Sequence, residues 1–237
     1  MKAVILAAGR GERLFPYTKE HPKPLTPVSG RPILEHVICT FKRAGIRDFV
    51  IVTGYLGHAI RRFLGNGSKM EATIRYAQNP SYHRGNATSL AAAQELLKND
   101  EIFILSMADH LLSEHIVERA LGHVDRQPLL CVDFDIIQPS KVKEATKVLV
   151  GSDGYIKDIG KAIPRWNALD TGLFLLNGAI FEAINDMKKV TNLLSLSHCV
   201  KHMIESHELW ACDVSGSLWL DIDTWEDLAH VRERCYL

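Results

Sequence analysis

Short apolar segments alternate with longer amphipathic segments over roughly the first 135 of the 237 residues. The apolar segments predict strands at 3–6, 49–52, 73–76, 102–105 and 129–134. The amphipathic segments predict helices at 32–44, 59–63, 88–97 and 113–121. Strands that are apolar on both sides need cover on both faces of the sheet. The alternation therefore predicts an α/β fold, with a Rossmann-like, mostly parallel (mixed) sheet and helices on both of its faces.

From about residue 140 the spacing of the apolar residues changes. Residues 146–150 and 155–159 flank the sequence Gly-Ser-Asp-Gly, which is typical of a β-hairpin turn. Further strands are predicted at 170–176 and 209–214, and further helices at 179–184, at 193–205 and from Thr224 onward. Because no Pro- or Ser-rich linker interrupts the chain, we expect a single domain over 1–237, with halves of about 1–135 and about 136–237.

Charge and hydropathy argue against several classes of protein. The chain carries 28 Lys and Arg against 28 Asp and Glu, so it has no basic excess for binding nucleic acid through bulk charge. No segment approaches the roughly 20 apolar residues that a membrane-spanning helix requires. The N-terminal apolar run ends before Arg10 and is too short for a signal peptide. The five cysteines are odd in number and lack zinc-ligand spacing, which indicates reduced thiols in a cytoplasmic protein.

A glycine-rich loop, Gly9-Arg10-Gly11, follows the first predicted strand. Small residues there let backbone N–H groups approach an anion, and Arg13 can add a bidentate contact to phosphate oxygens. Lys23, which lies between two prolines, supplies a second cation. The loop matches neither the dinucleotide-binding fingerprint nor the Walker A sequence. The alternative is a tight loop whose basic side chains are merely solvated.

The segment 6–38 as a whole resembles the signature of the sugar-phosphate nucleotidyltransferase family. The positions that match are Gly9, Gly11, Arg13, Leu14, Pro16, Thr18, Pro22, Lys23, Pro24, Leu25, Val28, Gly30, Pro32 and Ile33. The resemblance implies dependence on Mg²⁺ and attack of a phosphate monoester on the α-phosphorus of a nucleoside triphosphate, with release of pyrophosphate. It implies a nucleotide-binding first half, an acceptor-binding second half, and catalytic roles for Arg13 and Lys23. The implied nucleotide contacts in this segment are Leu6, Ala7, Ala8, Gly9 and Gly11.

Two acidic segments are candidates for holding the Mg²⁺ ion, which usually takes one or two carboxylates together with phosphates and waters. Asp109 follows strand 102–105, at the sheet edge where open α/β folds bind ligands. The resemblance makes Asp109 a metal ligand and places Ala108 at the nucleotide. In the segment 219–224, Asp221 matches the second metal ligand of the family and Asp223 is the next candidate. A helix cap is the alternative role for Asp109.

The segment 85–93, GNATSLAAA, is similar to the Gly-Asn-x-x-Ser-Leu run of family members that use CTP. In the family this region reads the base of the nucleotide. The resemblance therefore implies nucleotide contacts by Gln78, Gly85, Asn86 and Ser89. Ser89 has an alternative role as a cap of the helix that follows.

The segment 144–176 resembles the corresponding part of the members that transfer a cytidylyl group to inositol 1-phosphate. The resemblance implies that Lys147 and Lys161 approach the acceptor phosphate and that Asp170 and Thr171 line the acceptor pocket. Trp166 and Asn167 are further candidates for its wall. Solvated lysines beside a hairpin are the alternative interpretation.

The sequence therefore predicts an Mg²⁺-dependent cytidylyltransferase that makes a CDP-alcohol, with CDP-inositol as the first candidate. One alternative is uridylyl, thymidylyl or guanylyl transfer to a sugar 1-phosphate, and another is cytidylyl transfer to phosphocholine or aminoethylphosphonate. A non-catalytic nucleotide-binding module is disfavoured, because Arg13, Lys23, Asp109 and Asp221 are all present.

The expected partners are CTP, or another nucleoside triphosphate, and a small phosphorylated alcohol, but neither nucleic acid nor membrane. A membrane-embedded transferase that used the product would be a separate polypeptide. A homodimer stays open, since the apolar helix surfaces can pack internally or against a second copy.

Overall fold

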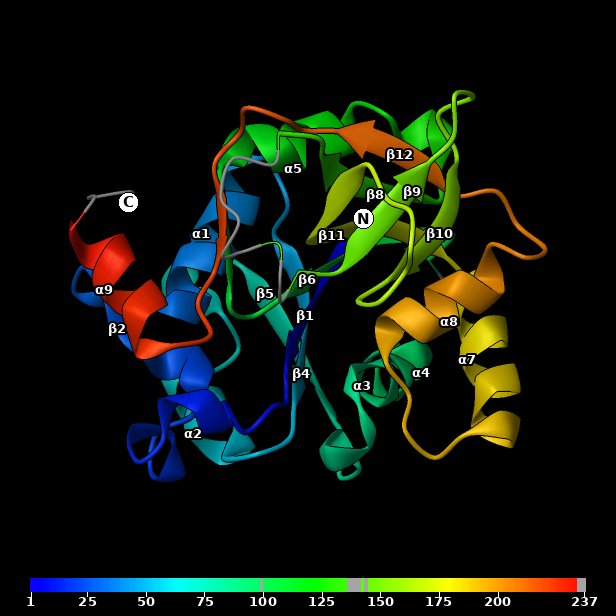
Figure 1. Ribbon diagram of the computed structural model, residues 1–237. Coiled ribbons are helices and arrows are strands. Elements are labelled where there is room, and N and C mark those ends of the chain that lie inside the picture. Colours follow the sequence, from blue (N-terminus) through cyan, green and yellow to red (C-terminus); the bar gives the residue numbers. More distant parts are fainter. Residues whose placement is uncertain (99, 136–141, 143–144, 234–237) are drawn as a thin grey trace.

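A nine-stranded sheet forms the centre of the computed structural model, which describes residues 1–98, 100–135, 142 and 145–233 (Figure 1). Its strands are β1 (Lys2–Ala7), β4 (Asp48–Thr53), β5 (Thr73–Gln78), β6 (Ile102–Met107), β8 (Leu129–Asp133), β9 (Lys147–Val150), β10 (Ile156–Gly160), β11 (Ala168–Asn177) and β12 (Trp210–Asp213). The main path runs β10-β9-β11-β6-β1-β4-β5, and β8 and β12 continue it beside β11. Strands β6, β1, β4 and β5 are parallel, whereas β11 is antiparallel to β6, β8 and β9. The sheet is mixed, as predicted.

Helices cover both faces of the sheet (Figure 1). One face packs against α1 (Ile33–Arg43), α2 (Gly57–Leu64), α5 (Glu114–Leu121) and α9 (Trp225–Glu233). The other face packs against α3 (Asn86–Ala92), α4 (Gln94–Leu97), α7 (Ala179–Val190) and α8 (Leu196–Met203). Successive strand side chains point to opposite faces, so Val4 and Ile5 of β1 enter different cores. This two-sided burial explains why the sequence of β1 is apolar at nearly every position.

Two short two-stranded sheets accompany the main sheet. The first pairs β2 (Pro27–Val28) with β3 (Arg31–Pro32), and the second pairs β7 (His110–Leu112) with β13 (Trp219–Asp221). In the second sheet Asp221 lies opposite His110, and the backbone N–H of Ile222 donates to the carbonyl of Asp109 at 3.0 Å. This pairing brings the last part of the chain back to the carboxyl end of β6. No sequence pattern indicates this pairing, because strands of three residues are too short to show an alternation of apolar and polar positions.

Most predicted elements are confirmed, and the main differences occur where distant segments bind each other. The hairpin predicted around residues 151–154 is formed by β9 and β10. The predicted helix at 193–205 begins only at Leu196, because the backbone of Leu194 is bonded to Arg84 and Ala87. Ser195 then caps α8 by accepting a hydrogen bond from the backbone N–H of His198 at 3.2 Å. The predicted helix at 88–97 is divided into α3 and α4.

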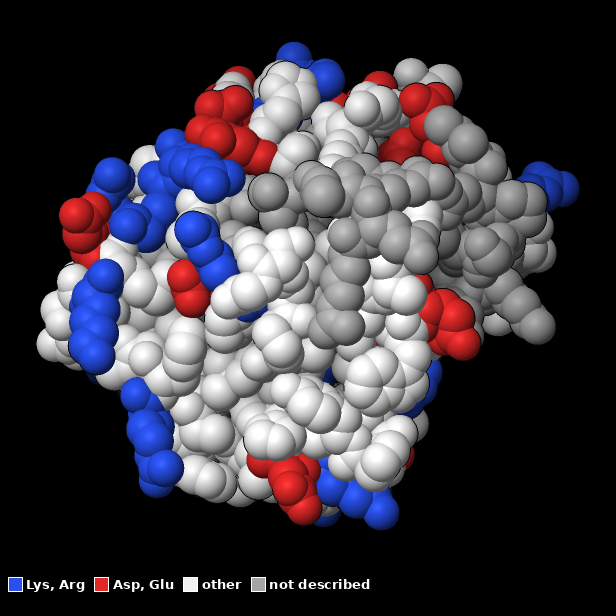
Figure 2. Space-filling view, turned by 90° about the vertical axis from the view of Figure 1, so that its left-hand side faces the viewer, with Lys and Arg blue, Asp and Glu red and all other residues white. Residues whose placement is uncertain are grey.

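The charged side chains do not gather into one broad patch on the face that carries α1, α2 and α9. Figure 2 shows Lys and Arg there singly or in small groups, between acidic and uncharged side chains. This distribution agrees with the balanced composition. In the described part of the chain, no helix has both the length and the apolar character needed to cross a membrane.

Candidate active site

A cavity of about 750 Å³ lies at the carboxyl ends of β1 and β6, between the first and the second half of the chain. A smaller cavity of about 380 Å³ adjoins it. The two cavities share Leu6, Gly9, Arg13, Asp109 and Asp223 in their walls. The site therefore lies at the sheet edge where open α/β folds bind ligands.

The cavity walls contain most of the residues that the sequence analysis selected. These residues are Leu6, Ala7, Ala8, Gly9, Gly11, Arg13, Lys23, Asn86, Ser89, Ala108, Asp109, Lys161, Asp170, Asp221 and Asp223. They come from both halves of the chain, so folding assembles the site from segments that are far apart in the sequence.

A buried lysine joins the two acidic segments. Lys23 Nζ lies 2.6 Å from Asp109 Oδ2 and 2.5 Å from Asp223 Oδ1, and the Lys23 side chain is only 8% exposed. The prolines on both sides of Lys23 and a short 3₁₀ turn at Lys23–Leu25 fix the direction of this side chain. Arg13 extends the cluster, since its Nη2 lies 3.1 Å from Asp223 Oδ2.

The ion pairs keep this cluster charged. Burial alone would lower the pKa of Lys23, but Asp109 and Asp223 outweigh burial and raise it above the ordinary value. Burial alone would likewise raise the pKa of Asp109, but Lys23 and, to a lesser degree, His110 outweigh it and hold the pKa below the ordinary value. The ammonium of Lys23 and the carboxylate of Asp109 therefore each favour the charged form of the other.

The glycines of the first loop have separate physical roles. Gly11 has a φ of +62°, and a Cβ there would come within 2.8 Å of Lys23 Cβ. It therefore allows Lys23 to approach the loop. At Gly9 nothing lies within 4 Å of where a Cβ would be, although Gly9 lines both cavities. A side chain at Gly9 would therefore enter the cavities without displacing other atoms of the protein.

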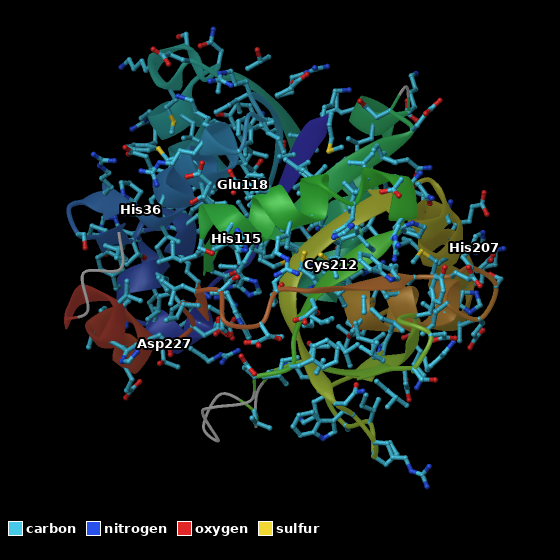
Figure 3. The ribbon with its side chains drawn as sticks, turned by 90° about the horizontal axis from the view of Figure 1, so that it is seen from above. His36, His115, Glu118, His207, Cys212 and Asp227 are labelled. Atoms are coloured by element: carbon cyan, nitrogen blue, oxygen red, sulfur yellow. The ribbon has the colours of Figure 1, made fainter. Side chains whose placement is uncertain are left out.

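A reciprocal cap positions Asp223. Thr224 Oγ1 accepts from the N–H of Asp227 at 3.2 Å, and Asp227 Oδ2 accepts from the N–H of Thr224 at 2.7 Å. Asp227 Oδ2 also accepts from the N–H of Asp223 at 2.9 Å. Figure 3 shows Asp227 at the beginning of α9. This reciprocal pair is a capping box at the start of the helix predicted from Thr224, and it fixes the backbone that carries Asp223 toward Lys23.

The wall beside α3 is held by the loop between α7 and α8. Asn86 Oδ1 accepts from the N–H of Leu196 at 2.7 Å. Ser89, which is buried, accepts from Asn79 Nδ2 at 2.9 Å instead of capping α3. Gly85 has a φ of +101°, and a Cβ there would lie 2.2 Å from the Leu194 carbonyl oxygen. Gly85 thus permits close contact between these segments but does not itself line either cavity.

The opposite wall carries Lys161 and Asp170. Burial raises the pKa of Asp170 to about 6, while the Gly172 N–H and His110 lower it in part. The Gly172 N–H donates to Asp170 Oδ1 at 2.7 Å. Asp170 is therefore a partly buried carboxyl group with one oxygen already engaged by the backbone.

Four further predicted site residues lie outside the described cavity walls. Gln78 is exposed at the end of β5, and Gly85 contacts Leu194 as described above. Lys147 Nζ donates to the Lys161 carbonyl at 2.8 Å. Thr171 is fully buried and its hydroxyl donates to the Cys131 carbonyl at 2.9 Å, so it supports the wall from behind. Trp166 and Asn167, the further candidates for the acceptor wall, are also not among the described lining residues. The Asn167 side chain instead bonds the backbone N–H and carbonyl of Val150.

Several lining residues were not selected from the sequence. They include Tyr82, Thr146, Gly172, Phe174, Ser195, Leu196, Ser197 and Trp219. Ser195 and Leu196 reach the cavity only because the loop before α8 binds the turn before α3. The sequence around Ser195 is typical of a helix cap, and a helix cap does not indicate that a residue contacts a ligand. His110 lines the cavity beside Asp109.

The donor set fits a hard divalent cation. Asp109 and Asp223 converge on one cationic atom, the ammonium of Lys23, which shows that both carboxylates reach the same point. Asp221 also lines the larger cavity, but its carboxylate is not paired with the Lys23 ammonium. Within the described residues, no cluster of three or more His, Cys, Asp or Glu side chains could hold a metal by itself. A cation that needs one or two carboxylates and takes its other ligands from phosphates and water suits this arrangement.

Comparison with known proteins agrees with this geometry. The chain is 32% identical over 233 residues to a protein of Rubrobacter xylanophilus and 34% identical over 232 residues to one of Aquifex aeolicus. Both are named bifunctional IPC transferase and DIPP synthase. The alignments cover 95% and 98% of this chain but only 50% and 51% of those proteins, so the chain spans about half the length of these curated relatives.

A solved structure has the same fold. It is described as the inositol-1-phosphate CTP transferase from T. maritima, and it superposes with a TM-score of 0.79 at 25% identity. The superposition covers 98% of this chain and 96% of the other. A family model described as nucleotidyl transferase matches residues 2–235, which include the glycine-rich loop, Lys23, Asp109, Asp221 and Asp223. By this match over almost its whole length, the chain belongs to the nucleotidyl transferase family.

Proposed function

We propose that the chain transfers a cytidylyl group from CTP to inositol 1-phosphate and so makes CDP-inositol and pyrophosphate in a Mg²⁺-dependent reaction. The choice of substrates is supported by the T. maritima structure, which is described as an inositol-1-phosphate CTP transferase. It is also supported by the similarity of the segments 85–93 and 144–176 to family members that use these substrates. Because the curated relatives are about twice as long, only this transfer step is proposed.

The observation that carries the proposal is the convergence of Arg13, Lys23, Asp109 and Asp223 where two cavities meet. The reaction brings a triphosphate and a phosphate monoester together, so its main obstacle is repulsion between negative charges. Preorganised cations next to a glycine-rich loop reduce this repulsion in the ground state and in the transition state. The chain presents them at the edge of the parallel strands.

In this proposal the nucleotide extends over both cavities, and the acceptor lies in the larger one. The triphosphate lies along the loop that contains Gly9 and Gly11, where backbone N–H groups, Arg13 and Lys23 offset its charge. The cytosine lies toward Asn86 in the larger cavity. The acceptor lies at the other wall, where Lys161 faces its phosphate and Asp170 accepts hydrogen bonds from its hydroxyl groups.

Asp109 and Asp223 would hold the Mg²⁺ ion, with Asp221 next to them. When bound, the ion would polarise the α-phosphate and offset the charge of the departing pyrophosphate. The protein's own residues position the two reactants. An oxygen of the acceptor phosphate forms a bond to the α-phosphorus, and the bond from that phosphorus to the bridging oxygen of pyrophosphate breaks. No side-chain nucleophile is required, since the attacking oxygen belongs to a largely ionised phosphate.

We also propose that the reaction takes place in the cytoplasm, where CTP is made. The four cysteines in the described part of the chain are free thiols, which suits a reducing compartment. The product is an activated alcohol, so an enzyme that transfers the phosphoinositol group onward would consume it.

The test is pyrophosphate release with Mg²⁺ from CTP, UTP, dTTP, GTP and ATP, each combined with inositol 1-phosphate, phosphocholine, aminoethylphosphonate and glucose 1-phosphate. Selective turnover of CTP with inositol 1-phosphate is the expected result. Turnover of another pair would keep the reaction type and overturn the proposed substrates. If no pair turns over, calorimetric titration with CTP distinguishes a binding protein from a chain that does not recognise the nucleotide.

A further inference from the structure

Asp170 lines the larger cavity and borders a bulge in β11. The pairing of β11 with β8 shifts register between Asp170 and Phe174. Gly172 lies in this bulge with a φ of +78°, and its N–H donates to Asp170 Oδ1 at 2.7 Å. Bulges re-aim side chains beside active sites. Here Asp170 is the last residue of β11 before the register shift, and the Gly172 N–H inside the bulge holds its Oδ1.

The imidazole of His110 lies directly on this bulge. Its Nδ1 is 3.1 Å from the carbonyl oxygen of Thr171. A carbonyl can only accept, so Nδ1 carries the proton and donates it. A Cβ placed on Gly172 would lie 2.0 Å from Nδ1 and 2.3 Å from Cε1 of His110. The ring therefore occupies the space that any side chain at position 172 would need.

His110 is itself firmly positioned. Its backbone belongs to β7 and pairs with Asp221 of β13. The residue before it is Asp109, and its Nε2 lies 3.9 Å from Asp109 Oδ1. The side chain is 18% exposed. One imidazole thus connects β7, which directly follows the proposed metal ligand Asp109, to β11, which carries the proposed acceptor ligand Asp170.

We propose that His110 is a positioning residue for the acceptor: by donating to the Thr171 carbonyl and packing on Gly172, it fixes the β11 bulge and thereby the direction of the Asp170 carboxylate. The proposal rests on the proposed function for the identity of the acceptor. Its geometric part, the support of the bulge by the ring, does not depend on which acceptor is used. His110 acts through Asp170, so it affects recognition of the acceptor and not of the nucleotide.

Three substitutions of His110 distinguish the effect of the Nδ1 hydrogen-bond donor from the effect of the rest of the imidazole ring. The amide nitrogen of Asn can take the place of Nδ1, whereas the longer Gln side chain places its nitrogen near Nε2 and Ala has no donor. We expect His110→Ala and His110→Gln to raise the KM for inositol 1-phosphate about 10-fold, the effect of losing one oriented hydrogen bond. The KM for CTP should stay within about twofold of the wild-type value, and His110→Asn should largely restore the acceptor KM. The control is His115→Ala on α5, an exposed histidine labelled in Figure 3.

A double-substitution cycle tests the route of the effect. If His110 acts through Asp170, His110→Ala should add little to the acceptor KM of Asp170→Asn. Additive effects would overturn the proposal. An unchanged acceptor KM in His110→Ala would also overturn it, as would a rise in the KM for CTP alone, which would indicate a role through Asp109.

Amide hydrogen exchange tests the support of the bulge without turnover. His110→Ala should accelerate exchange in the segment 168–174 and leave β1 and β4 unchanged, while His110→Asn should retain most of the protection. Equal protection in wild type and His110→Ala would overturn the proposal even if the enzyme is active. If the wild-type chain does not use inositol 1-phosphate, the proposed substrates are wrong. The exchange experiment still decides whether His110 fixes the bulge.

Discussion

Lys23 Nζ lies 2.5 Å from Asp223 Oδ1, although the two residues are 200 positions apart in the sequence. The same ammonium lies 2.6 Å from Asp109 Oδ2. Lys23, the turn after β6 and the segment before α9 therefore meet at one atom, the Lys23 ammonium nitrogen. Charge neutralisation at this point depends on correct packing of the first and last parts of the chain.

This convergence predicts different roles for the two C-terminal aspartates. We expect Asp109→Asn and Asp223→Asn each to lower kcat/KM at least about 100-fold, or about 2.7 kcal/mol, because both carboxylates reach the proposed cation position. Asp221→Asn should have a smaller effect, since Asp221 lines the cavity but does not contact Lys23. Mg²⁺ titrations of activity, with Glu226→Gln on the exposed first turn of α9 as the control, measure this difference. A larger loss for Asp221→Asn than for Asp223→Asn would contradict it.

The ion pairs of Lys23 also predict a pH-dependent contribution to stability. The pKa of Asp109 is depressed in the folded state, so its interaction with Lys23 stabilises the fold above the ordinary carboxyl pKa and is lost as the pH falls through the folded value. Lys23→Met removes the partner of two partly buried carboxylates. In metal-free buffer at about pH 7.5 we expect the free energy of unfolding to fall by about 1–3 kcal/mol. The difference should be smaller at about pH 3, because Asp109 begins to protonate as the pH falls toward its depressed pKa. Urea unfolding measures it, and an equal loss at both pH values would refute the electrostatic explanation.

The first half of the fold is readable from sequence because its information is local. Apolar strands and amphipathic helices recur in the order that a parallel sheet with crossovers requires, and the structure forms them close to the predicted ranges. The pair of β7 and β13 was missed for the opposite reason. Each strand has three residues, and what defines them is their contact with each other. The start of α8 is likewise set by Leu194, whose backbone bonds to a segment more than 100 residues earlier.

The site likewise contains residues that the sequence predicts and residues that it does not. The resemblance of the segment 6–38 to a known family was enough to select Arg13 and Lys23, and both line the cavities. The polar wall formed by Ser195 and Ser197 could not be selected, because it reaches the cavity through a loop contact that no local pattern encodes. Thr171 was predicted as an acceptor contact but does not line the cavity. Its neighbour Asp170 faces the cavity, whereas the Thr171 hydroxyl is buried against Cys131. Adjacent strand residues point to opposite sides, so a motif alone does not assign both to a ligand.

Two glycines at the site should respond differently to alanine. At Gly85 a Cβ would clash with the Leu194 carbonyl, and the φ of +101° is strained for any other residue. We expect Gly85→Ala to lower the free energy of unfolding by about 3 kcal/mol or more. At Gly9 a Cβ meets no atom within 4 Å, so Gly9→Ala should leave thermal stability unchanged but weaken CTP binding. Calorimetric titration and thermal unfolding of both variants test this. Unimpaired CTP binding by Gly9→Ala would remove Gly9 from the proposed phosphate site.

The two lysines predicted for the acceptor should also differ. Lys161 lines the larger cavity, whereas Lys147 Nζ donates to the Lys161 backbone carbonyl. We expect Lys161→Ala to raise the KM for the acceptor about 10-fold, the loss of about 1.4 kcal/mol, with the KM for CTP little changed. Lys147→Ala should raise it less, since it removes only support for the segment that carries Lys161. Steady-state kinetics with each substrate varied in turn distinguish these outcomes. A larger effect of Lys147 would mean that Lys147 contacts the acceptor phosphate directly.

The raised pKa of Asp170 predicts that this carboxylate destabilises the folded chain at neutral pH. Its pKa is about 6 in the folded state, against an ordinary value of 3.8. Below about pH 3.8 the group is protonated in both states and has no effect, whereas above about pH 6 its ionisation favours unfolding by up to about 3 kcal/mol. Asp170→Asn keeps an oxygen for the Gly172 N–H but cannot ionise. The variant should therefore be more stable than wild type near about pH 8 and equally stable near about pH 4, as measured by urea unfolding. A variant that is less stable at the higher pH would show that the ionised carboxylate stabilises the bulge, and its burial would then have no net cost.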